Sequence, residues 1–245
     1  NNFIEKSKDT LNQKFDGKFH KNEFIDAKYI FLNKSVETKE ALYKKLNFDS
    51  DKKLVVVYSH NVFDGVFENR RKLYIDYYIW LKDTIRLLSK NKNINVLLKK
   101  HPTEFAHSTI EDITYRALKT AEQNEISHIK MYPENLSPSF VRDNADCIIT
   151  GSGTAGLEFA CFGIPSVTCF SSAYSYCGTT NEAKTVEEYA YLIENIHKIE
   201  RLNNDQIEKS LVLYYLINFL DKNDNDFFTD LPSYLPADMV GFKKS

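Results

Sequence analysis

Residues 151–167 combine, in one short run, a turn of small residues, a helical pattern and a return to apolar residues. The run reads Gly-Ser-Gly-Thr-Ala-Gly-Leu-Glu-Phe-Ala-Cys-Phe-Gly-Ile-Pro-Ser-Val and follows the apolar segment 147–149. A strand that enters such a turn and continues as a helix directs unpaired backbone N–H groups and the positive end of the helix dipole at one point. Five of the eight glycines lie between positions 151 and 178, and glycine lets a backbone approach a bound group closely. The run therefore predicts a strand–turn–helix–strand unit whose turn binds an anion.

Apolar runs of strand length alternate with helical patterns over residues 54–198. A continuous β-branched run such as Lys53–Tyr58 is typical of a strand buried on both faces. The alternation predicts an α/β fold with a Rossmann-like, doubly wound parallel sheet. Ligands of such sheets bind beyond the carboxyl ends of the strands, so we expect the loops there to open on one crevice. The expected strands are 53–58, 94–98, 126–131, 146–150 and 166–170, and the expected helices are 36–47, 72–90, 110–121, 138–143, 154–162, 186–199 and 205–220.

The composition is that of a globular chain with little net charge. Its 245 residues are 42% hydrophobic and 27% charged, with a net charge of -2, which offers no bulk argument for binding nucleic acid. No apolar run approaches the roughly 20 residues that span a bilayer. The four cysteines include no C-x-x-C pair, which argues against a zinc site and favours reduced thiols in a cytoplasmic protein.

Ser152, Gly153 and Thr154 are the expected phosphate-binding turn, because hydroxyl and N–H groups can bind a phosphate or diphosphate there. The alternative is an ordinary helix N-cap with a tight turn. The motif is not the opening G-x-G-x-x-G of a dinucleotide-binding domain, and no Gly-Lys-Ser/Thr follows it as in a P-loop. Glu158 lies on the same helix face as Thr154 and is expected to accept hydrogen bonds from ribose hydroxyls. Its alternative is a solvated helix charge.

Two further candidate clusters follow the first and second strands. Pro102 cannot continue a strand ladder, so His101 is expected at a strand end, where it would donate to a phosphate or act as an acid on a leaving group. Lys100 adds positive charge, and the alternative for this cluster is a surface turn. His60 and Asp64, after the first strand, are candidates for contacting an acceptor or acting as a base, with an ordinary turn as the alternative.

The order of these motifs resembles that of bacterial GT-B glycosyltransferases. Lys100-His101-Pro102 followed by Ser152-Gly153-Thr154 is similar to the HP and Ser/Thr motifs of capsule polysaccharide synthesis proteins, Kdo transferases, bacterial sialyltransferases and CDP-glycerol glycerophosphotransferases. Many of these relatives have Ser-Ser or Ser-Thr where this chain has Ser152-Gly153-Thr154. The resemblance covers roughly residues 54–198 and implies the carboxyl-terminal, donor-binding domain of the GT-B fold. Further matching segments are 77–81, 95–102, 145–146, 153–165 and 187–189.

The resemblance implies a role for each motif. His101 would contact the donor phosphate and assist the departing nucleotide, Ser152 and Thr154 would bind the same phosphate, and Glu158 would bind the donor's sugar ring. The mechanism implied is independent of metal and of any cofactor, with a nucleotide-activated donor, CMP- or CDP-linked, as the substrate. The acceptor implied is a growing capsule or surface polysaccharide, or a lipid-linked precursor. The expected location is the cytoplasm, with peripheral association at the inner face of the cell membrane left open.

A GT-B enzyme also has an amino-terminal domain of similar size, which usually supplies the acceptor site and the catalytic base. We therefore expect residues 1–52 to be a linker or a remnant of that domain, residues 53–200 to be the nucleotide-sugar-binding domain, and residues 201–245 to be a closing helix and an irregular tail. Without the missing domain, the chain is expected to bind nucleotide but to turn over poorly. The alternatives are an enzyme similar to non-hydrolysing UDP-sugar 2-epimerases, a non-catalytic nucleotide-sugar-binding module and a purely structural α/β module.

Overall fold

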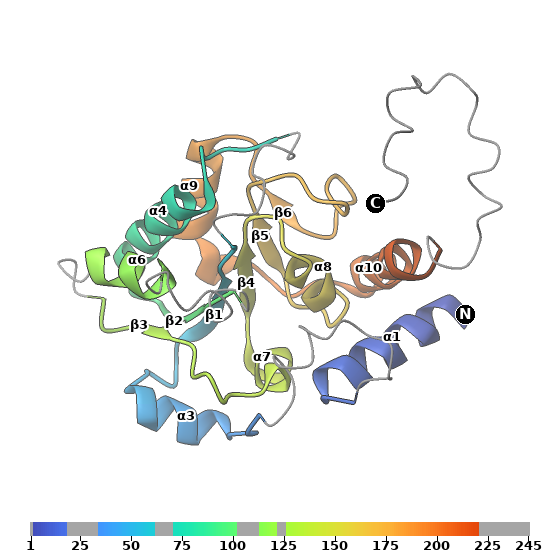
Figure 1. Cartoon of the computed structure of the whole chain (residues 1–245), viewed down its shortest axis with the longest axis horizontal. Helices are drawn as coiled ribbons and strands as arrows, with labels where there is room; N and C mark the ends of the chain where they lie inside the picture. Colours follow the sequence, from blue (N-terminus) through green and yellow to red (C-terminus); the bar gives the residue numbers. More distant parts are fainter. Residues whose placement is uncertain (1, 19–33, 62–70, 102–112, 122–125, 221–245) are drawn as a thin grey trace, which may run out of the picture.

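Six parallel strands form one sheet at the centre of the computed structural model, which describes residues 2–18, 34–61, 71–101, 113–121 and 126–220 (Figure 1). The strand order is β3-β2-β1-β4-β5-β6, and every neighbouring pair is parallel. Because the order changes direction between β1 and β4, the sheet is Rossmann-like and doubly wound, as the sequence predicts. The strands are β1 (Lys53–Tyr58), β2 (Ile94–Lys99), β3 (Ile129–Met131), β4 (Cys147–Thr150), β5 (Ser166–Thr168) and β6 (Asn181–Glu182).

Helices cover both faces of the sheet and enclose two separate cores. Val55 and Val57 face the core beneath α4 (Tyr77–Lys90), α6 (Ile113–Ala121) and α9 (Val186–Glu194). Leu54 and Val56, which point the other way, face the core beneath α1, α7, α8 and α10. This two-sided burial explains why β1 is apolar at consecutive positions instead of alternating. The helices of the second face are α1 (Asn2–Phe15), α7 (Pro138–Asn144), α8 (Ala155–Ala160) and α10 (Asn204–Tyr215), and α3 (Lys39–Leu46) precedes β1.

Side-chain caps set the helix starts and correct several expected bounds. Thr38 accepts a hydrogen bond from the N–H of Ala41, so α3 begins at Lys39 and not at 36. Asp76 caps α4 in the same way, which moves its start from the expected 72 to Tyr77. The expected helix 186–199 is divided, because α9 ends at Glu194 and a 3-10 turn follows over Ile196–Lys198.

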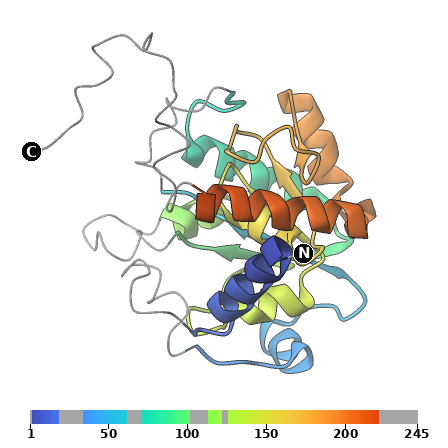
Figure 2. The ribbon, with the colours of Figure 1, turned by 90° about the vertical axis from the view of Figure 1, so that its right-hand side faces the viewer.

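Helix α1 was not predicted, and it lies beside α10 on the second face (Figures 1 and 2). Its buried side chains are Ser7, Leu11 and Phe15, a stripe too narrow to mark a helix in a polar, lysine-rich segment. Ser7 Oγ donates to the carbonyl of Leu211 in α10 at 2.9 Å. The domain boundaries at residues 52 and 200 remain predictions, and the expected tail lies outside the described residues.

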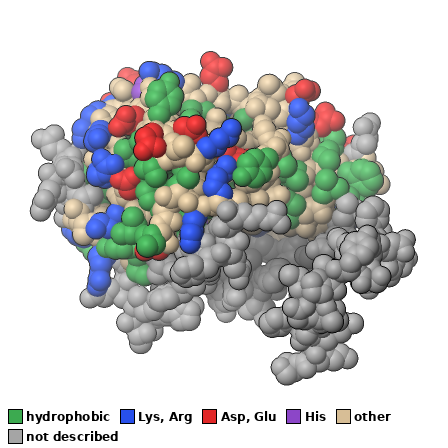
Figure 3. Space-filling view, turned by 90° about the horizontal axis from the view of Figure 1, so that it is seen from above, with side chains coloured by type: hydrophobic (Ala, Val, Ile, Leu, Met, Phe, Trp, Pro, Cys, Tyr) green, Lys and Arg blue, Asp and Glu red, His purple; other side chains and the backbone are tan. Residues whose placement is uncertain are grey.

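Acidic and basic side chains lie interspersed on the face seen in Figure 3, in keeping with the small net charge of the chain. None of the helices in the described part of the chain combines the length and apolar character that crossing a bilayer requires.

A buried hydrogen-bond network joins α4 to α9. Trp80 Nε1 donates to the hydroxyl of Tyr189 at 2.9 Å, and that hydroxyl lies 2.8 Å from Thr84 Oγ1. Thr84 Oγ1 in turn donates to the backbone carbonyl of Trp80 at 2.7 Å. The side chains of Trp80 and Tyr189 are fully buried, so no water can replace a lost partner without opening the core.

We expect Tyr189→Phe to lower the free energy of unfolding by about 1–3 kcal/mol, because it leaves the buried indole N–H of Trp80 without an acceptor. Urea titration monitored by circular dichroism measures this loss. Tyr191→Phe is the control: Tyr191 is exposed on the same helix, and its change should stay within about 0.5 kcal/mol. Equal effects of the two substitutions would contradict the role of the network.

Candidate functional site

The turn between β4 and α8 is held in place by side chains from the end of β4 and from the loop after β1. His60 Nε2 accepts a hydrogen bond from the N–H of Ser152 at 3.2 Å and lies 3.0 Å from Thr150 Oγ1. Thr150 Oγ1 accepts from the N–H of Gly153 at 3.2 Å. The N–H groups of Ser152 and Gly153, which we expected to bind an anion, therefore donate to side chains of the protein itself.

His60 is neutral in this arrangement. Burial, together with a smaller effect of the nearby charge of His101, lowers its pKa to about 3. Because Nε2 accepts hydrogen bonds, the ring proton is on Nδ1. The ring also stacks on Tyr77, with centroids 4.2 Å apart and planes inclined by 10°. His60 is thus fixed on both sides and orients the turn.

Tyrosine hydroxyls hold two more points of the turn. Tyr77 OH lies 3.0 Å from Ser152 Oγ, and Tyr174 OH donates to the carbonyl of Gly153 at 2.5 Å. A Cβ on Gly156 would lie 2.5 Å from Tyr174 OH, and a Cβ on Gly153 would lie 2.8 Å from Thr150 Oγ1. These glycines therefore admit the protein's own side chains, whereas the sequence suggested that they admit a ligand.

A cavity of about 690 Å³ opens beside the turn. Thr154 lines it, and its hydroxyl does not cap the helix that follows. The backbone N–H groups of Thr154 and Ala155 have no hydrogen-bond acceptor among the described residues. The other lining residues come from the turn itself, from α8, from the loop after β5, from α10 and from the π-helical segment Leu216–Leu220 that follows it: Ser152, Leu157, Glu158, Ser171, Ser172, Ala173, Tyr174, Tyr176, Tyr214, Ile217 and Asn218.

Glu158 brings a nearly buried carboxylate to the wall of this cavity. The residue is 8% exposed, and its Oε1 accepts a hydrogen bond from Lys14 Nζ at 2.8 Å. Lys14 belongs to α1, whose Phe15 packs edge-on against Phe159 at 5.1 Å. The charge of Glu158 is thus compensated from a helix far away in the sequence, while Oε2 has no partner among the described residues.

Lys99, at the end of β2, places a second amine near Glu158. Its Nζ lies over the rings of Tyr132 and Tyr58, 4.5 and 5.3 Å from their centroids. Burial and the charge of Lys34 lower the pKa of Lys99 to about 7, and Glu158 opposes that shift. Lys99 is therefore partly neutral near pH 7.

The structure brings some of the predicted site residues together and separates others. Ser152, Thr154 and Glu158 line the cavity, with Gly153 in the turn between them. His60 lies behind the turn, close enough to His101 for the two rings to interact electrostatically. Lys100 pairs with Glu134 after β3, at 3.6 Å. Asp64 and Pro102 lie outside the described residues, and the roles of all these residues remain predictions.

Several residues near the cavity could not be identified from the sequence, or only from a weak pattern. Lys14 and Arg71 belong to polar segments of no evident pattern, and only folding brings them near the cavity. Tyr174 and Tyr176 lie in a serine-rich loop that reads as an ordinary connection. Their one available signal is the number of hydroxyl side chains that follow a predicted strand end. Within the described ranges, no three His, Cys, Asp or Glu side chains group closely enough to hold a metal ion.

Comparison with known proteins finds likeness among solved structures only. No protein-family model matches the chain, and no curated protein does. The solved structures include KpsC, the β-Kdo 2,4 transferase of Thermosulfurimonas dismutans, at 14% identity and a TM-score of 0.45, over 87% of this chain and 55% of that one. The wall teichoic acid polymerase TagF matches at 15% identity and a TM-score of 0.46, over 85% and 45%.

A protein described as a UDP-N-acetylglucosamine 2-epimerase, from Listeria monocytogenes, matches at 13% identity and a TM-score of 0.43, over 76% of this chain and 45% of that one. The chain spans about half the length of each of these proteins. The fold assignment rests on the strand order of the chain itself, and these likenesses carry no argument about its ligand or reaction.

We expect the imidazole of His60 to stay neutral down to about pH 4, because burial holds its folded-state pKa near 3. The unfolded chain takes up this proton near pH 6.5, so stability should fall as the pH is lowered from about 6.5 toward 3. Histidine NMR titration measures the pKa, and urea unfolding at pH 7.5 and 5 measures the linkage.

His60→Gln is the matched variant, since glutamine keeps an acceptor but has no proton to take up. It should be less stable than the parent chain at pH 7.5, with a smaller difference at pH 5. A His60 resonance that titrates near pH 6.5 in the folded protein would contradict this account.

Proposed function

We propose that this chain is the donor-binding half of a glycosyltransferase that moves a sugar or sugar-like group from a nucleotide-activated donor. The observation that carries the proposal is the cavity at the carboxyl edge of the sheet, next to the point where the strand order changes direction. Ligands of doubly wound sheets bind at this point. Its volume of about 690 Å³ is within the range of sites for ligands of nucleotide size.

The donor phosphate would lie against the turn after β4. Thr154 offers a hydroxyl without a capping bond, and the N–H groups of Thr154 and Ala155 are available as donors. Ser152 Oγ, already held by Tyr77, would add a further donor. These four groups come from consecutive or neighbouring positions, as a phosphate with several acceptor oxygens requires.

Glu158 would bind the ribose of the donor. Lys14 occupies its Oε1 and fixes the carboxylate, which leaves Oε2 to accept hydrogen bonds from ligand hydroxyls. A carboxylate that is oriented before the ligand arrives loses little conformational entropy on binding.

His101 would hydrogen-bond to the leaving phosphate and assist departure of the nucleotide, and Lys100 would add positive potential beside it. His60 is a poor candidate for the catalytic base, because its Nε2 already accepts a hydrogen bond from the turn. We therefore include in the proposal an acceptor-binding domain that supplies the base. A cytidine donor, a metal-independent mechanism, a surface-polysaccharide acceptor and a cytoplasmic location complete the proposal.

The chain should bind a nucleoside phosphate. Calorimetry with CMP, CDP and UDP is expected to detect at least one complex, with a matching rise in the thermal midpoint by mass action. Thr154→Val keeps the shape of the side chain but removes its hydroxyl, and should weaken that complex by about 10-fold or more. Thr120→Val, on α6 and outside the cavity lining, is the control and should leave affinity unchanged.

Other outcomes would favour the alternatives. Absence of binding by all three nucleotides would overturn the donor-binding proposal. Slow interconversion of UDP-N-acetylglucosamine at carbon 2, followed by NMR, would favour an epimerase. Tight nucleotide binding with no transfer in the presence of a complementing domain would favour a non-catalytic binding module.

His101→Ala is expected to lower the turnover of an active transferase form by about 100-fold or more, since it removes one preorganised donor to the leaving group. Nucleotide affinity should change much less, because the turn after β4 supplies most of the phosphate contacts in the proposal. Steady-state kinetics and calorimetry on the same preparation separate the two effects. An unchanged turnover would exclude the proposed role of His101.

A further inference from the structure

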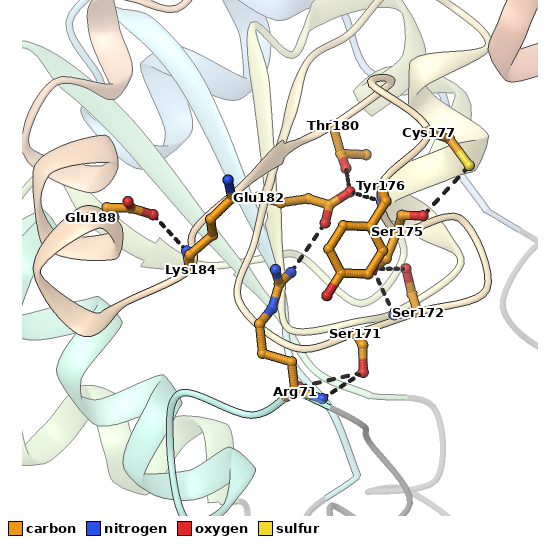
Figure 4. Close-up of polar contacts among 10 residues, drawn as sticks. All are labelled: Arg71, Ser171, Ser172, Ser175, Tyr176, Cys177, Thr180, Glu182, Lys184 and Glu188. Atoms are coloured by element: carbon orange, nitrogen blue, oxygen red, sulfur yellow. Dashed lines mark hydrogen bonds and ion pairs between the residues drawn. The ribbon is translucent and has the colours of Figure 1, made fainter.

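The loop between β5 and β6 forms one wall of the cavity and is fastened to the segment that precedes α4 (Figure 4). Phe170 and Lys72 form an antiparallel bridge. Ser171 N donates to the carbonyl of Arg71 at 2.9 Å, and Arg71 N donates to Ser171 Oγ at 3.0 Å. The start of the loop is therefore held by backbone as well as side-chain bonds.

Glu182 joins this fastened segment to the tip of the loop. Its Oε2 accepts from Arg71 Nη2 at 3.1 Å, and its Oε1 accepts from the backbone N–H of Tyr176 at 2.5 Å (Figure 4). The side chains of Arg71 and Glu182 are only 17% and 10% exposed. A largely desolvated ion pair contributes little net stability, because desolvation offsets its attraction. Here the pair fixes the carboxylate that binds the backbone of Tyr176.

The backbone of Tyr176 has an energetically unfavourable conformation. Its φ of 66° is in the left-handed region, which costs about 1 kcal/mol or more for a residue other than glycine. The side chain is 73% exposed, and the guanidinium of Arg71 lies over the ring, 5.1 Å from its centroid. Arg71 covers one face of the ring, the rest of the residue is largely exposed, and Tyr176 is among the residues that line the cavity.

The position of this ring relative to Glu158 indicates which part of a donor it would meet. Glu158 pairs with Lys14 of α1, and the neighbouring Phe159 packs against Phe15 of α1 and Tyr58 of β1, so this part of α8 lies on the side of the turn toward α1 and β1. The backbone N–H of Tyr176 is bound to Glu182 of β6, and β6 and β1 lie on opposite sides of β4 in the sheet. A donor with its ribose at Glu158 and its phosphate at the turn would extend its third part, the transferred group, toward Tyr176.

We propose that Tyr176, Ser171 and Ser172 form the subsite for the transferred group, and that this group is a polyhydroxylated ring or chain. Its C–H face would lie on the open face of the Tyr176 ring, and its hydroxyls would meet the serine hydroxyls. Ser172 Oγ lies 3.3 Å from Ser175 Oγ and interacts with the hydroxyl of Tyr174, which orients it, and a hydroxyl can form three hydrogen bonds in all. This subsite rests on the proposed function, because it presumes a nucleotide-linked donor.

Calorimetry with three matched pairs tests the subsite: CMP against CMP-sialic acid, CDP against CDP-glycerol, and UDP against UDP-N-acetylglucosamine. In the pair that binds, Tyr176→Gly should weaken the intact donor by about 3- to 10-fold and change the bare nucleotide by less than about 2-fold. Tyr176→Phe should retain the affinity for the donor, since it keeps the ring.

Glycine at position 176 also separates function from folding. Because glycine adopts a positive φ without strain, Tyr176→Gly should keep or raise the thermal midpoint while it loses affinity for the donor. Tyr191→Ala, which removes a similarly exposed tyrosine on α9, is the control and should alter neither quantity.

Three results would overturn the subsite. One is equal weakening of donor and bare nucleotide by Tyr176→Gly, which would place the nucleotide itself on the ring. Another is an unchanged affinity for both. The third is absence of nucleotide binding by the parent chain, which would remove the proposed function and the subsite together, whereas the first two leave the proposed function intact.

Discussion

The parallel pairing of β1 with β4 is the constraint on which the site depends. Tyr58 and Thr150 are partners in register, so the two strands end at the same level. The residues that follow each strand therefore meet, and His60 Nε2 accepts the N–H of Ser152. A shift of the pairing by one residue would turn alternate side chains to the opposite core and separate His60 from the turn. The geometry of the turn after β4 is thus a consequence of strand register.

Two carboxylates line or support the cavity, and each is compensated by a cation from a distant segment. Lys14 of α1 pairs with Glu158, and Arg71, before α4, pairs with Glu182. Pairs with so little exposure contribute little net stability, but they hold a charged group in one orientation. Helix α1 is therefore part of the environment of the cavity, although it is far from α8 in the sequence.

The sequence was a good guide to the central strands of the sheet. The five predicted strands are present. A run such as Lys53–Tyr58 is apolar at consecutive positions because both of its faces are buried. This pattern can be recognised without knowing which elements pack against the strand. Strand β6 could not be predicted, since Asn181 and Glu182 have no apolar pattern and join the sheet only through β5. The glycines were recognised as close-approach positions, but what approaches them is the protein's own Tyr174 and Thr150.

The residue types of the turn, and its place at a strand end, are determined by the sequence alone. A Ser-Gly-Thr run after an apolar strand leaves N–H groups and hydroxyls at one edge of the sheet, whatever surrounds it. The tertiary structure decided which of these groups stay available. It assigned the N–H of Ser152 to His60, paired Glu158 with Lys14, and placed Tyr176 in the wall of the cavity. These outcomes depend on contacts between residues up to 144 positions apart, and no local pattern encodes such contacts.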